Sequence, residues 1–415
     1  MRIAVLVHSL NGIGGEAKQA LHVSREFVAM GHEVVVWSVE HDRDLCYPEL
    51  AEGLDIRTLR PAGPQRADAP QKLLGSRMLA YMWSLARYYH DQRRLSLAMP
   101  GGYDLVNAHG NAISWAAAAY KRRHNTPTVW LCNDFWPMAS HRYEVVSNTW
   151  PKVKHKLKEA LCFPFDRHDQ SAVREMDRVA VLSERVRLQM MEHYGIDPVI
   201  VRPGVESSRF AGGGGQRVRE RYLESHRTFL LLTVCQLAPW RRIEDVVEGV
   251  RILVDEGLDI TYLVVGGTLR PAYARSVREE VSARHLGDRV VFTGEVSEEE
   301  LVDCYHACDA FVWASDENQS WGLAGMEAMS AGKPVIVSSA NGLAEALEDG
   351  KTGLLVSPRS PEAIADAVRR LVREPALAQS IAGEGQRLVR ERYSWRRHAE
   401  DLLALSRQAV DGHQG

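Results

Sequence analysis

The chain has 415 residues, of which 45% are hydrophobic and 25% are charged, the composition of an ordinary globular protein. At roughly 150 residues per domain, the length predicts two or three domains. The 51 Lys and Arg residues nearly balance the 54 Asp and Glu residues, which argues against nucleic acid as a partner. The apolar stretches are far shorter than the ~20 residues that span a bilayer, which argues against a transmembrane protein.

The N-terminus indicates a first strand and not a signal peptide. Residues 3–7 form an apolar run after a single early charge, and no small-residue cleavage site follows. We therefore expect a cytoplasmic protein. The six cysteines show no metal-site spacing, and Cys304 and Cys308, four residues apart, are expected to share a buried helix face.

Short β-branched runs alternate with helical segments along the first half of the chain. One helix is expected from about Glu16 to Met30, where Gly31 ends it before the next strand. The expected strands are residues 3–7, 32–37, 104–109, 128–132, 177–183 and 199–204. Strands of this kind separated by helices predict a parallel, doubly wound sheet.

A second series of the same kind follows the Ala-Gly-Gly-Gly-Gly segment at residues 211–215. Its expected strands are residues 229–234, 260–267, 290–294, 310–313, 334–337 and 353–356, with a helix at 243–255. The predicted fold class is therefore α/β, with two Rossmann-like doubly wound domains joined near residues 205–215. The glycine run is typical of a linker, although a surface loop within one domain has the same composition.

The glycine-rich turn after the first strand matches the G-x-G-x-x-A spacing of a dinucleotide fingerprint, with Gly12, Gly14 and Ala17 in the three positions. Glu40 stands where an acidic residue would hold a ribose. Four residues separate the strand from Gly12, however, whereas the fingerprint begins where the strand ends, so a nicotinamide or flavin cofactor is the weaker interpretation. In either case, glycines at a helix N-terminus allow backbone N–H groups to approach an anion.

Two charged segments each have a general and a more specific interpretation. Asp42 and Asp44 have the spacing that holds a divalent metal on a sugar diphosphate, but no other ligand candidates surround them, and a solvated loop is the simpler interpretation. A second segment consists of Lys152, Lys154, Lys156 and Lys158. This basic run is expected as a solvated helix face, and its alternative is contact with a phosphate-bearing acceptor or an anionic membrane surface.

The densest chemistry lies in residues 316–329, where a polar cluster follows an expected strand and Gly322 opens a helix that carries Glu327. The pattern places several backbone N–H donors and one inward carboxylate at the carboxyl end of a parallel sheet, where such folds bind ligands. Leu323, Met326 and Met329 mark this turn as buried, so Glu327 needs partners, which ligand hydroxyls would supply. A capping role for Glu327 is the alternative.

Taken in order, these motifs resemble the family-4 glycosyltransferases, retaining enzymes with the GT-B fold. The matching segments are residues 14–16, 201–210, 234–241, 294–301, 322–327, 331–336, 342–345, 353–356 and 393–395. They span nearly the whole chain, and residues 322–336 are the most specific. The resemblance implies an N-terminal acceptor-binding domain, 1–207, a C-terminal donor-binding domain, 208–394, a cleft between them, and a last helix, 395–415, that crosses back to the N-terminal domain.

The resemblance also implies which residues bind the donor, a nucleoside-diphosphate sugar. They are Gly14, Gly15, Gln236, Arg241, Arg242, Gly294, Glu295, Asn318, Gln319, Gly322, Leu323 and Glu327. Arg241, with Arg242 sharing its role, and the helix N-termini at the two glycine turns would stabilise the leaving diphosphate. Glu327 would hold the ribose hydroxyls, and no metal or other cofactor would be needed.

The catalytic residues that the resemblance implies are His109, Arg241, Gln319 and Glu327. His109 stands at the position of a family histidine near the reacting centre, whereas from the residues alone a strand-end histidine is more often structural. The reaction would retain the anomeric configuration by front-face attack, with a donor phosphate oxygen taking the acceptor proton.

The sequence departs from the family pattern at four places. Gln319 stands where members often carry Glu, so it can hydrogen-bond sugar hydroxyls but brings no negative charge to a cationic sugar. Cys235 and Gln236 replace the usual Gly-Arg, which removes one expected cation, and Arg241 stands at the position of a lysine. The pair at 133–134 is Asn-Asp where the family more often has His-Asp. These changes bear on sugar choice more than on the reaction class.

The acceptor site is expected on the N-terminal domain. Its candidate residues are Glu16, Asn133, Asp134, Trp136 and His141. Asp134 is interpreted as orienting an acceptor hydroxyl or amine, with an ordinary loop as the alternative, and the aromatic loop suits stacking on a sugar or cyclitol ring. The expected acceptors are a lipid-linked saccharide, a growing polysaccharide or a small natural-product aglycone.

Three other functions stay open at this point. A nucleotide-sugar epimerase with the same fold would turn over donor without any acceptor. A hinged, non-catalytic binding protein would only capture a sugar ligand, but that class is usually exported, and the N-terminus predicts no export signal. A dinucleotide-dependent oxidoreductase would bind NAD(P)H.

Overall fold

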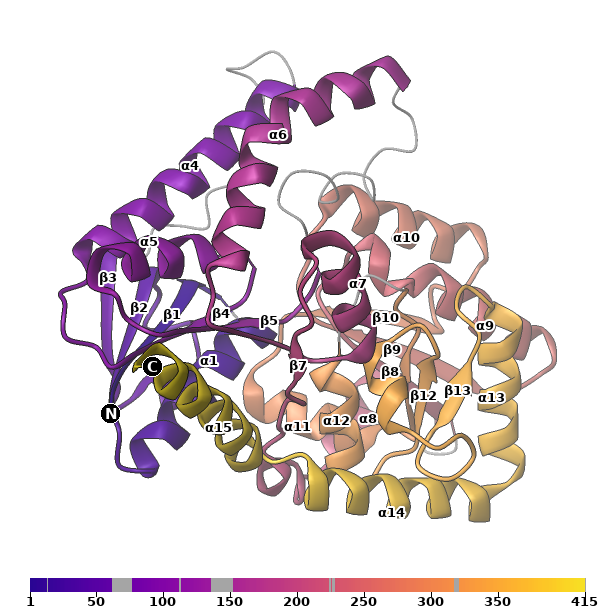
Figure 1. Cartoon of the computed structure of the whole chain (residues 1–415). Coiled ribbons are helices and arrows are strands. Elements are labelled where there is room, and N and C mark those ends of the chain that lie inside the picture. Colours follow the sequence, from indigo (N-terminus) through magenta and orange to yellow (C-terminus); the bar gives the residue numbers. More distant parts are fainter. Residues whose placement is uncertain are drawn as a thin grey trace. The chain divides into compact units, whose positions relative to one another are not determined.

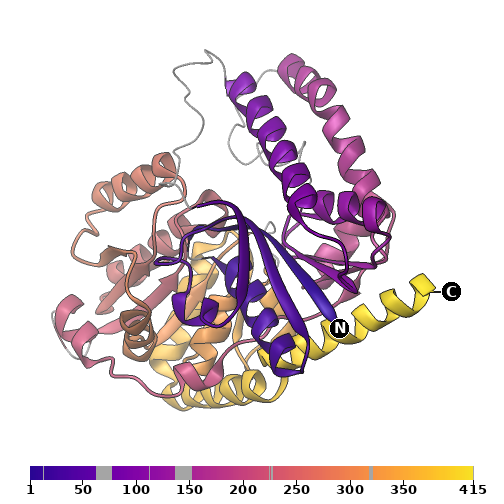
Figure 2. The same ribbon diagram turned by 90° about the vertical axis from the view of Figure 1, so that its left-hand side faces the viewer.

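The computed structural model describes the chain except residues 13, 62–76, 112, 136–151, 224, 226–227, 317–320 and 415, and gives the backbone alone for residues 77–82, 152–161 and 414. The chain folds as two compact units, one formed by Met1–Arg202 with Trp395–Gly415 and the other by Pro203–Ser394 (Figure 1). Each unit is a parallel sheet with helices on both faces, as Figures 1 and 2 show. The predicted α/β class with two doubly wound sheets is confirmed.

The sheet of the first unit has seven strands in the order β3-β2-β1-β4-β5-β6-β7. They are β1 (Arg2–Leu10), β2 (Glu33–His41), β3 (Asp55–Pro61), β4 (Leu105–His109), β5 (Thr128–Cys132), β6 (Arg178–Val181) and β7 (Val199–Ile200). All the pairs between these strands are parallel. Residues 3–7 of β1 are fully buried, as expected for a central strand that is covered on both faces.

The described helices of the first unit are α1 (Gly15–Ala29), α2 (Pro48–Ala51), α4 (Arg77–Ala98), α5 (Ser114–His124), α6 (Lys152–Arg174), α7 (Glu184–Tyr194) and α15 (Trp395–Gln414). α4, α5 and α6 pack on one another, and Ala4 and Leu6 of β1 face the core on their side of the sheet. α1 and α15 pack on each other at the opposite face. α15 fits there because Ala399, Leu402 and Leu405 recur at helical spacing and are buried.

The sheet of the second unit has six parallel strands in the order β10-β9-β8-β11-β12-β13. They are β8 (Phe229–Val234), β9 (Ile260–Val265), β10 (Val290–Gly294), β11 (Ala310–Trp313), β12 (Val335–Ser338) and β13 (Leu354–Val356). Six strands were predicted in this unit, and the bounds of each differ from the observed bounds by at most two residues. Strong apolar runs of this kind are easy to recognise because both faces of each strand are buried.

The helices of the second unit are α8 (Gln216–Tyr222), α9 (Ile243–Asp255), α10 (Pro271–Ala283), α11 (Glu298–Ala307), α12 (Leu323–Ser330), α13 (Pro361–Arg373) and α14 (Pro375–Arg392). Three short 3-10 turns, η2 (Ser207–Phe210), η3 (Pro239–Arg241) and η4 (Gly342–Ala346), join elements. α9 shows why these segments are helical: Ile243, Val246, Val247, Val250 and Leu253 are all buried, and their spacing forms one apolar face.

Strand β3 was not predicted, and its composition gives the reason. Asp55, Arg57 and Arg60 interrupt any apolar run in it. β3 lies at the edge of its sheet, where charged residues protect the open side from pairing with another chain. An edge strand therefore lacks the signal that identifies a central one.

Two glycines of the run at residues 212–215, Gly213 and Gly215, pack against α11 within the second unit. A Cβ on Gly213 would lie 2.3 Å from Cδ2 of His306, and one on Gly215 would lie 2.4 Å from the backbone nitrogen of Ala307. Only glycine fits at such a distance from backbone. We predicted the join near residues 205–215, whereas the chain passes from one unit to the other between Arg202 and Pro203.

Candidate functional site

In both units, candidate residues lie near the point where the strand order of the sheet reverses. β1 has β2 and β4 as its neighbours, and β8 has β9 and β11, so the strands that follow are added on opposite sides. In doubly wound sheets, ligands bind outside the carboxyl ends of the strands at such a switch point. The segments after β8 and β11, and those after β1 and β4, are therefore the candidates for ligand contact.

Two arginines follow β8, and they have different surroundings. The guanidinium of Arg241 lies 4.7 Å from the centre of the Trp313 ring, at the end of β11. Arg242 donates to Asp245 from Nε at 2.9 Å and from Nη2 at 2.8 Å, and its Nη1 lies 2.8 Å from Glu244. Partial burial opposes the charge on Arg242, but hydrogen bonding to Asp245 and the charge of Glu244 raise its pKa above the usual value. Arg242 is thus held by its own helix.

Helix α12 begins at the carboxyl end of β11, and its N-cap is Gly322. This glycine has a φ of +99°, and a Cβ on it would lie 2.9 Å from Nε1 of Trp313. Both the backbone and the space therefore require glycine here. Glycine has no side chain to cap the helix, and Leu323 in the first turn is partly exposed, so the positive end of the helix is suited to an anion. The predicted contacts Asn318 and Gln319 lie outside the described residues.

Glu327 lies in the second turn of α12 with 7% of its surface exposed. Its Oε2 accepts a hydrogen bond of 2.8 Å from the hydroxyl of Tyr305 in α11. Tyr305 is fully buried, and burial together with the charge of Glu327 raises its pKa well above the usual value. The hydroxyl therefore stays protonated and donates to the carboxylate.

The other donor candidates of the second unit also lie at the carboxyl ends of its strands. Gln236, two residues after β8, is exposed, and Gly294 ends β10 with a φ of +75°. The carboxylate of Glu295 lies against Gly267, because a Cβ on that glycine would be 2.3 Å from Oε1. The structure thus brings the predicted residues Gln236, Arg241, Gly294 and Glu295 to the carboxyl ends of β8 and β10, one on each side of β9.

In the first unit, Gly14 is the N-cap of α1, and its backbone is extended and exposed. A Cβ on Gly14 would meet no atom within 4 Å, so nothing in the described chain requires glycine at this position. A glycine that packing does not require leaves room for another molecule to approach the backbone. Gly15, the first residue of α1, is also exposed.

Glu16 extends from the first turn of α1 to the end of β4. A Cβ on Gly110 would lie 2.0 Å from Cδ of Glu16, and Gly110 has a φ of +93°. The carboxylate of Glu16 therefore occupies the space that any larger residue at position 110 would fill. This places the predicted acceptor contact Glu16 at the switch point between β1 and β4.

His109 ends β4, and its side chain is completely buried. Nε2 contacts Oδ1 of Asn107, while burial and the nearby His398 of α15 lower the pKa of His109 to about 3. The imidazole is therefore neutral at physiological pH. We predicted a histidine near the reacting centre, and the structure places it inside the first unit, where no solvent reaches it.

Asn133 and Asp134 follow β5, with Asn133 buried and Asp134 half-buried. The backbone carbonyl of Asp134 lies 3.3 Å from Sγ of Cys132, and Phe135 packs edge-on against Tyr194. These two contacts fix the start of the predicted acceptor loop. Trp136 and His141 lie outside the described residues.

Asp42 and Asp44, for which a solvated loop was the simpler interpretation, lie in a local turn. Oδ1 of Asp42 accepts hydrogen bonds of 3.1 Å from the backbone N–H groups of Asp44 and Leu45, which makes it part of a turn. Among the residues that the structure describes, no cluster of three His, Cys, Asp or Glu side chains could hold a metal ion. The six cysteines are buried, and none of them forms a disulfide.

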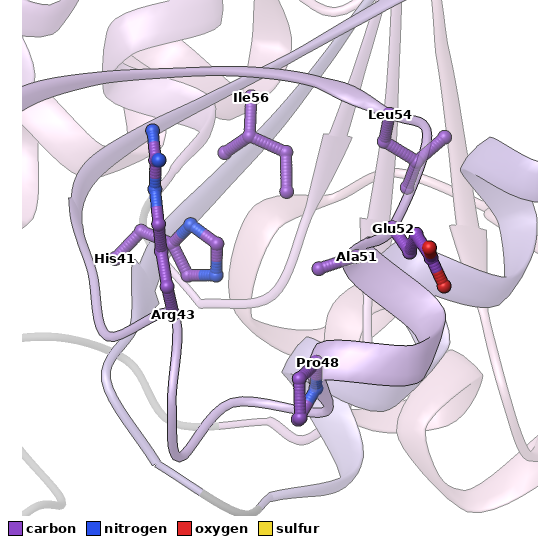
Figure 3. A pocket seen from close by; sticks show the side chains of 7 residues that line it. All are labelled: His41, Arg43, Pro48, Ala51, Glu52, Leu54 and Ile56. Carbon is purple, nitrogen blue, oxygen red and sulfur yellow. The ribbon is translucent and has the colours of Figure 1, made fainter.

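A cavity of about 300 Å³ lies between the end of β2, α2 and the start of β3 (Figure 3). Its lining comprises His41, Arg43, Pro48, Ala51, Glu52, Leu54 and Ile56. Burial and the charge of Arg43 lower the pKa of His41, so its imidazole is a neutral hydrogen-bonding group. None of the predicted site residues is among the described residues that line it.

The lysines at residues 152–158 belong to the start of α6, and their side chains lie outside the described part of the chain. Contact of this run with an acceptor phosphate or a membrane stays a prediction. No described helix combines the length and the apolar character that crossing a bilayer requires.

Two family models match the chain one after the other. The model described as Glycosyltransferase Family 4 matches residues 13–209, and the model described as Glycosyl transferases group 1 matches residues 216–388. The chain is a family-4, group 1 glycosyltransferase. A D-inositol 3-phosphate glycosyltransferase of Streptomyces scabiei is 28% identical to it over 335 residues, which are 76% of this chain and 69% of that protein.

Solved structures share the fold of this glycosyltransferase. The Anabaena protein Alr3699/HepE, in complex with UDP and glucose, has a TM-score of 0.71 at 16% identity, with 97% of this chain and 98% of that chain covered. Sucrose-phosphate synthase of Thermosynechococcus elongatus has a TM-score of 0.73 at 21% identity, with 99% of both chains covered. The predicted GT-B fold is confirmed. Because the chain belongs to a glycosyltransferase family, the two alternative functions of oxidoreductase and non-catalytic binding protein are set aside.

Sequence reasoning missed two residues that contact the predicted donor-binding residues. Trp313 lies between Arg241 and Gly322, and Tyr305 holds Glu327. Both precede the polar cluster at residues 316–329, in segments that resemble ordinary apolar core. Only the packing of α11 and β11 shows that their polar edges face the site residues.

Proposed function

We propose that this glycosyltransferase transfers a sugar from a nucleoside diphosphate to a hydroxyl of a cyclitol or saccharide, with retention of the anomeric configuration. The observation that carries the proposal is the arrangement at the ends of β8 and β11. The guanidinium of Arg241 and the N-cap Gly322 of α12 both pack against Trp313. Glu327 follows about one turn further along α12. Two positive groups and one buried carboxylate match the charges of a diphosphate and the hydroxyls of a ribose.

The leaving diphosphate is stabilised by Arg241 and by the N-terminus of α12. Arg241 presents a planar guanidinium that can bind two phosphate oxygens at once, and it is kept in place by the ring of Trp313. Arg242 has a different part: because Asp245 and Glu244 bind it, it holds the turn that carries Arg241. Positive charge from the protein replaces the metal ion that other transferases use on a diphosphate, so no cofactor besides the nucleotide sugar is needed.

Two comparisons support the choice of donor and acceptor. Alr3699/HepE has the same fold and was solved with UDP and glucose, which supports a nucleoside diphosphate as the donor carrier. The relative from Streptomyces scabiei is named for D-inositol 3-phosphate, which supports a cyclitol or saccharide acceptor. We assign two carboxylates to acceptor hydroxyls. The Glu16 carboxylate extends from α1 to the end of β4, and Asp134 follows β5.

The course of the transfer is assigned by resemblance to the family. The acceptor oxygen bonds to the anomeric carbon on the face from which the diphosphate leaves, while the bond from that carbon to the phosphate oxygen breaks. The departing phosphate oxygen takes the proton of the acceptor hydroxyl, so no covalent nucleophile is used. His109, buried and neutral, supports the end of β4 and does not act as a base. Gln319 and Asn318 are assigned to the donor sugar by resemblance.

Replacing Glu327 by Gln tests the donor site. The change keeps the size of the side chain but removes the charge, so hydrogen bonds from ribose hydroxyls weaken. We expect the dissociation constant of the best-bound nucleoside diphosphate to rise about 10- to 100-fold. Calorimetric titration with UDP, GDP, ADP and dTDP measures it.

Glu256→Gln is the matched control. Glu256 precedes the amino end of β9, away from the carboxyl ends of the strands, and forms an ion pair of 2.7 Å with Arg369. This variant should leave binding unchanged. Equal affinity of wild type and Glu327→Gln would contradict the assignment of the donor site. A screen of acceptors with mass detection then identifies the product, and turnover of donor without any acceptor would favour the epimerase.

A further inference from the structure

The hydroxyl of Tyr305 is a hydrogen-bond partner of the Glu327 carboxylate. The two side chains come from different helices, α11 and α12, and the hydrogen bond between them is 2.8 Å long. A carboxylate on a single helix can rotate about its own side-chain bonds, and a hydrogen bond from a second element restricts that rotation. Tyr305 therefore restricts the orientation of the carboxylate.

The ring of Tyr305 is held in turn by aromatic neighbours. Phe210 of η2 packs edge-on to it with ring centres 5.5 Å apart, and Phe311 of β11 lies 6.0 Å away. All three side chains are buried to 1% exposure or less. Because close-packed interiors leave a ring little freedom, the hydroxyl of Tyr305 is presented at a fixed point.

We propose that Tyr305 is a positioning residue, which orients the Glu327 carboxylate so that it distinguishes a ribose from a deoxyribose in the donor nucleotide. The inference rests on the proposed function, in which Glu327 binds the ribose. A carboxylate has roughly four acceptor positions, and Tyr305 uses one of them. Tyr305 thereby fixes the plane in which the others lie. Vicinal hydroxyls need acceptors in a set geometry, so loss of this restraint weakens recognition of the hydroxyls more than binding of the diphosphate.

The test compares ribonucleotides with their 2′-deoxy analogues. UDP, GDP and ADP and the corresponding deoxynucleotides are titrated into wild type and into Tyr305→Phe, a change that keeps the ring and removes only the hydroxyl. We expect wild type to prefer the ribonucleotide of the best-bound pair, and the variant to lose about 3- to 10-fold of that preference. Affinity for the deoxynucleotide should stay nearly the same.

A matched control separates positioning from folding. Tyr262 of β9 is also fully buried, and its hydroxyl donates one hydrogen bond of 2.9 Å, to Thr233. Tyr262→Phe thus loses a comparable buried hydrogen bond without touching Glu327. We expect it to lower the melting temperature about as much as Tyr305→Phe and to leave the preference for ribose unchanged.

A double-mutant cycle completes the design. When Glu327 is already Gln, adding Tyr305→Phe should change the ribose preference no further, because both changes act on one interaction. If Glu327→Gln abolishes the preference while Tyr305→Phe keeps it in full, the inference is wrong and the proposed function stands. If no nucleotide binds to wild type, or if Glu327→Gln keeps the preference, the proposed function fails and takes the inference with it.

Discussion

At the scale of single residues, the glycines show which positions the fold itself requires. Gly322 is required by its φ of +99° and by the ring of Trp313 beside it. Gly110 is required by its φ of +93° and by the carboxylate of Glu16. Gly14 is required by neither backbone nor neighbours, although the sequence placed it in the same kind of glycine-rich turn. The described chain therefore gives no structural requirement for glycine at position 14.

Gly110→Ala tests the contact of Glu16 with the end of β4. The new Cβ would displace the Glu16 carboxylate, and the positive φ would cost about 1–2 kcal/mol of unfolding free energy. We expect KM for the acceptor to rise several-fold at unchanged donor affinity. Gly102→Ala is the control: its φ is +91°, but its nearest neighbour is Nη1 of Arg2 at 3.5 Å. Equal effects of the two variants on acceptor KM would show that Glu16 takes no part.

At the scale of elements, α15 is joined to the first unit by a polar cluster as well as by its apolar face. Nδ1 of His398 lies 2.8 Å from the backbone carbonyl of Arg202, and Nε2 lies 3.2 Å from Nε2 of Gln19 in α1. The carbonyl can only accept, so Nδ1 carries the proton and Nε2 accepts from the amide. Trp395 stacks on His22 of α1 at 4.6 Å. The imidazole of His398 is thus needed in its neutral form.

This cluster makes the stability of the first unit depend on pH. Burial lowers the pKa of His398 to about 4, below the value of 6.5 in the unfolded chain. The unfolded state then binds more protons as the pH falls from about 7 to about 4, so stability is full above pH 6.5 and decreases below it. The effect of His398 amounts to about 3 kcal/mol at most, and that of His109 has the same sign.

His398→Gln should therefore make this dependence shallower. The variant keeps a hydrogen-bonding side chain but has no proton to gain, and His109 is left to supply the remaining slope. Apparent unfolding midpoints at about pH 5 and pH 7.5 measure the change. The exposed His90 of α4 provides the control, His90→Gln, which should behave as wild type. A variant with the full wild-type slope would rule out His398 as the source.

At the scale of the whole molecule, the chain is two sheets with separate cores. The first core needs segments from both ends of the chain, since α15 comes from residues beyond the second unit. The second core is contiguous from Pro203 to Ser394. The proposed donor residues after β8 and β11 belong to that contiguous unit, whereas the acceptor candidates belong to the divided one.

Truncation after Ser394 should consequently affect the two units differently. The loss of α15 removes the buried face formed by Ala399, Leu402 and Leu405, so we expect the first unit to unfold or aggregate. The second unit should keep its thermal transition and its affinity for the nucleoside diphosphate, which calorimetry can follow. A chain that ends at Val410 retains the buried face and is the control. Loss of nucleotide binding in the longer deletion would contradict the assignment of the donor site to the second unit.

The sequence by itself determined the fold class, the central strands and the family. Buried parallel strands require apolar runs, and the start of α12 requires glycine at position 322, so both leave a local signal. The motif around Gly322 and Glu327 was recognisable for the same reason. Edge strand β3 left no such signal, because its charged residues resemble a loop.

Only the tertiary structure decided what surrounds each side chain. Tyr305 and Glu327 are 22 residues apart, and Gln19 and His398 are 379 apart, so no spacing rule relates them. The sequence suggested that Arg242 shares the role of Arg241, but Arg242 is bound by Asp245 and Glu244, whereas Arg241 packs on Trp313. Burial, hydrogen bonding and pKa depend on which elements pack together. That is a property of the whole chain and not of any one segment.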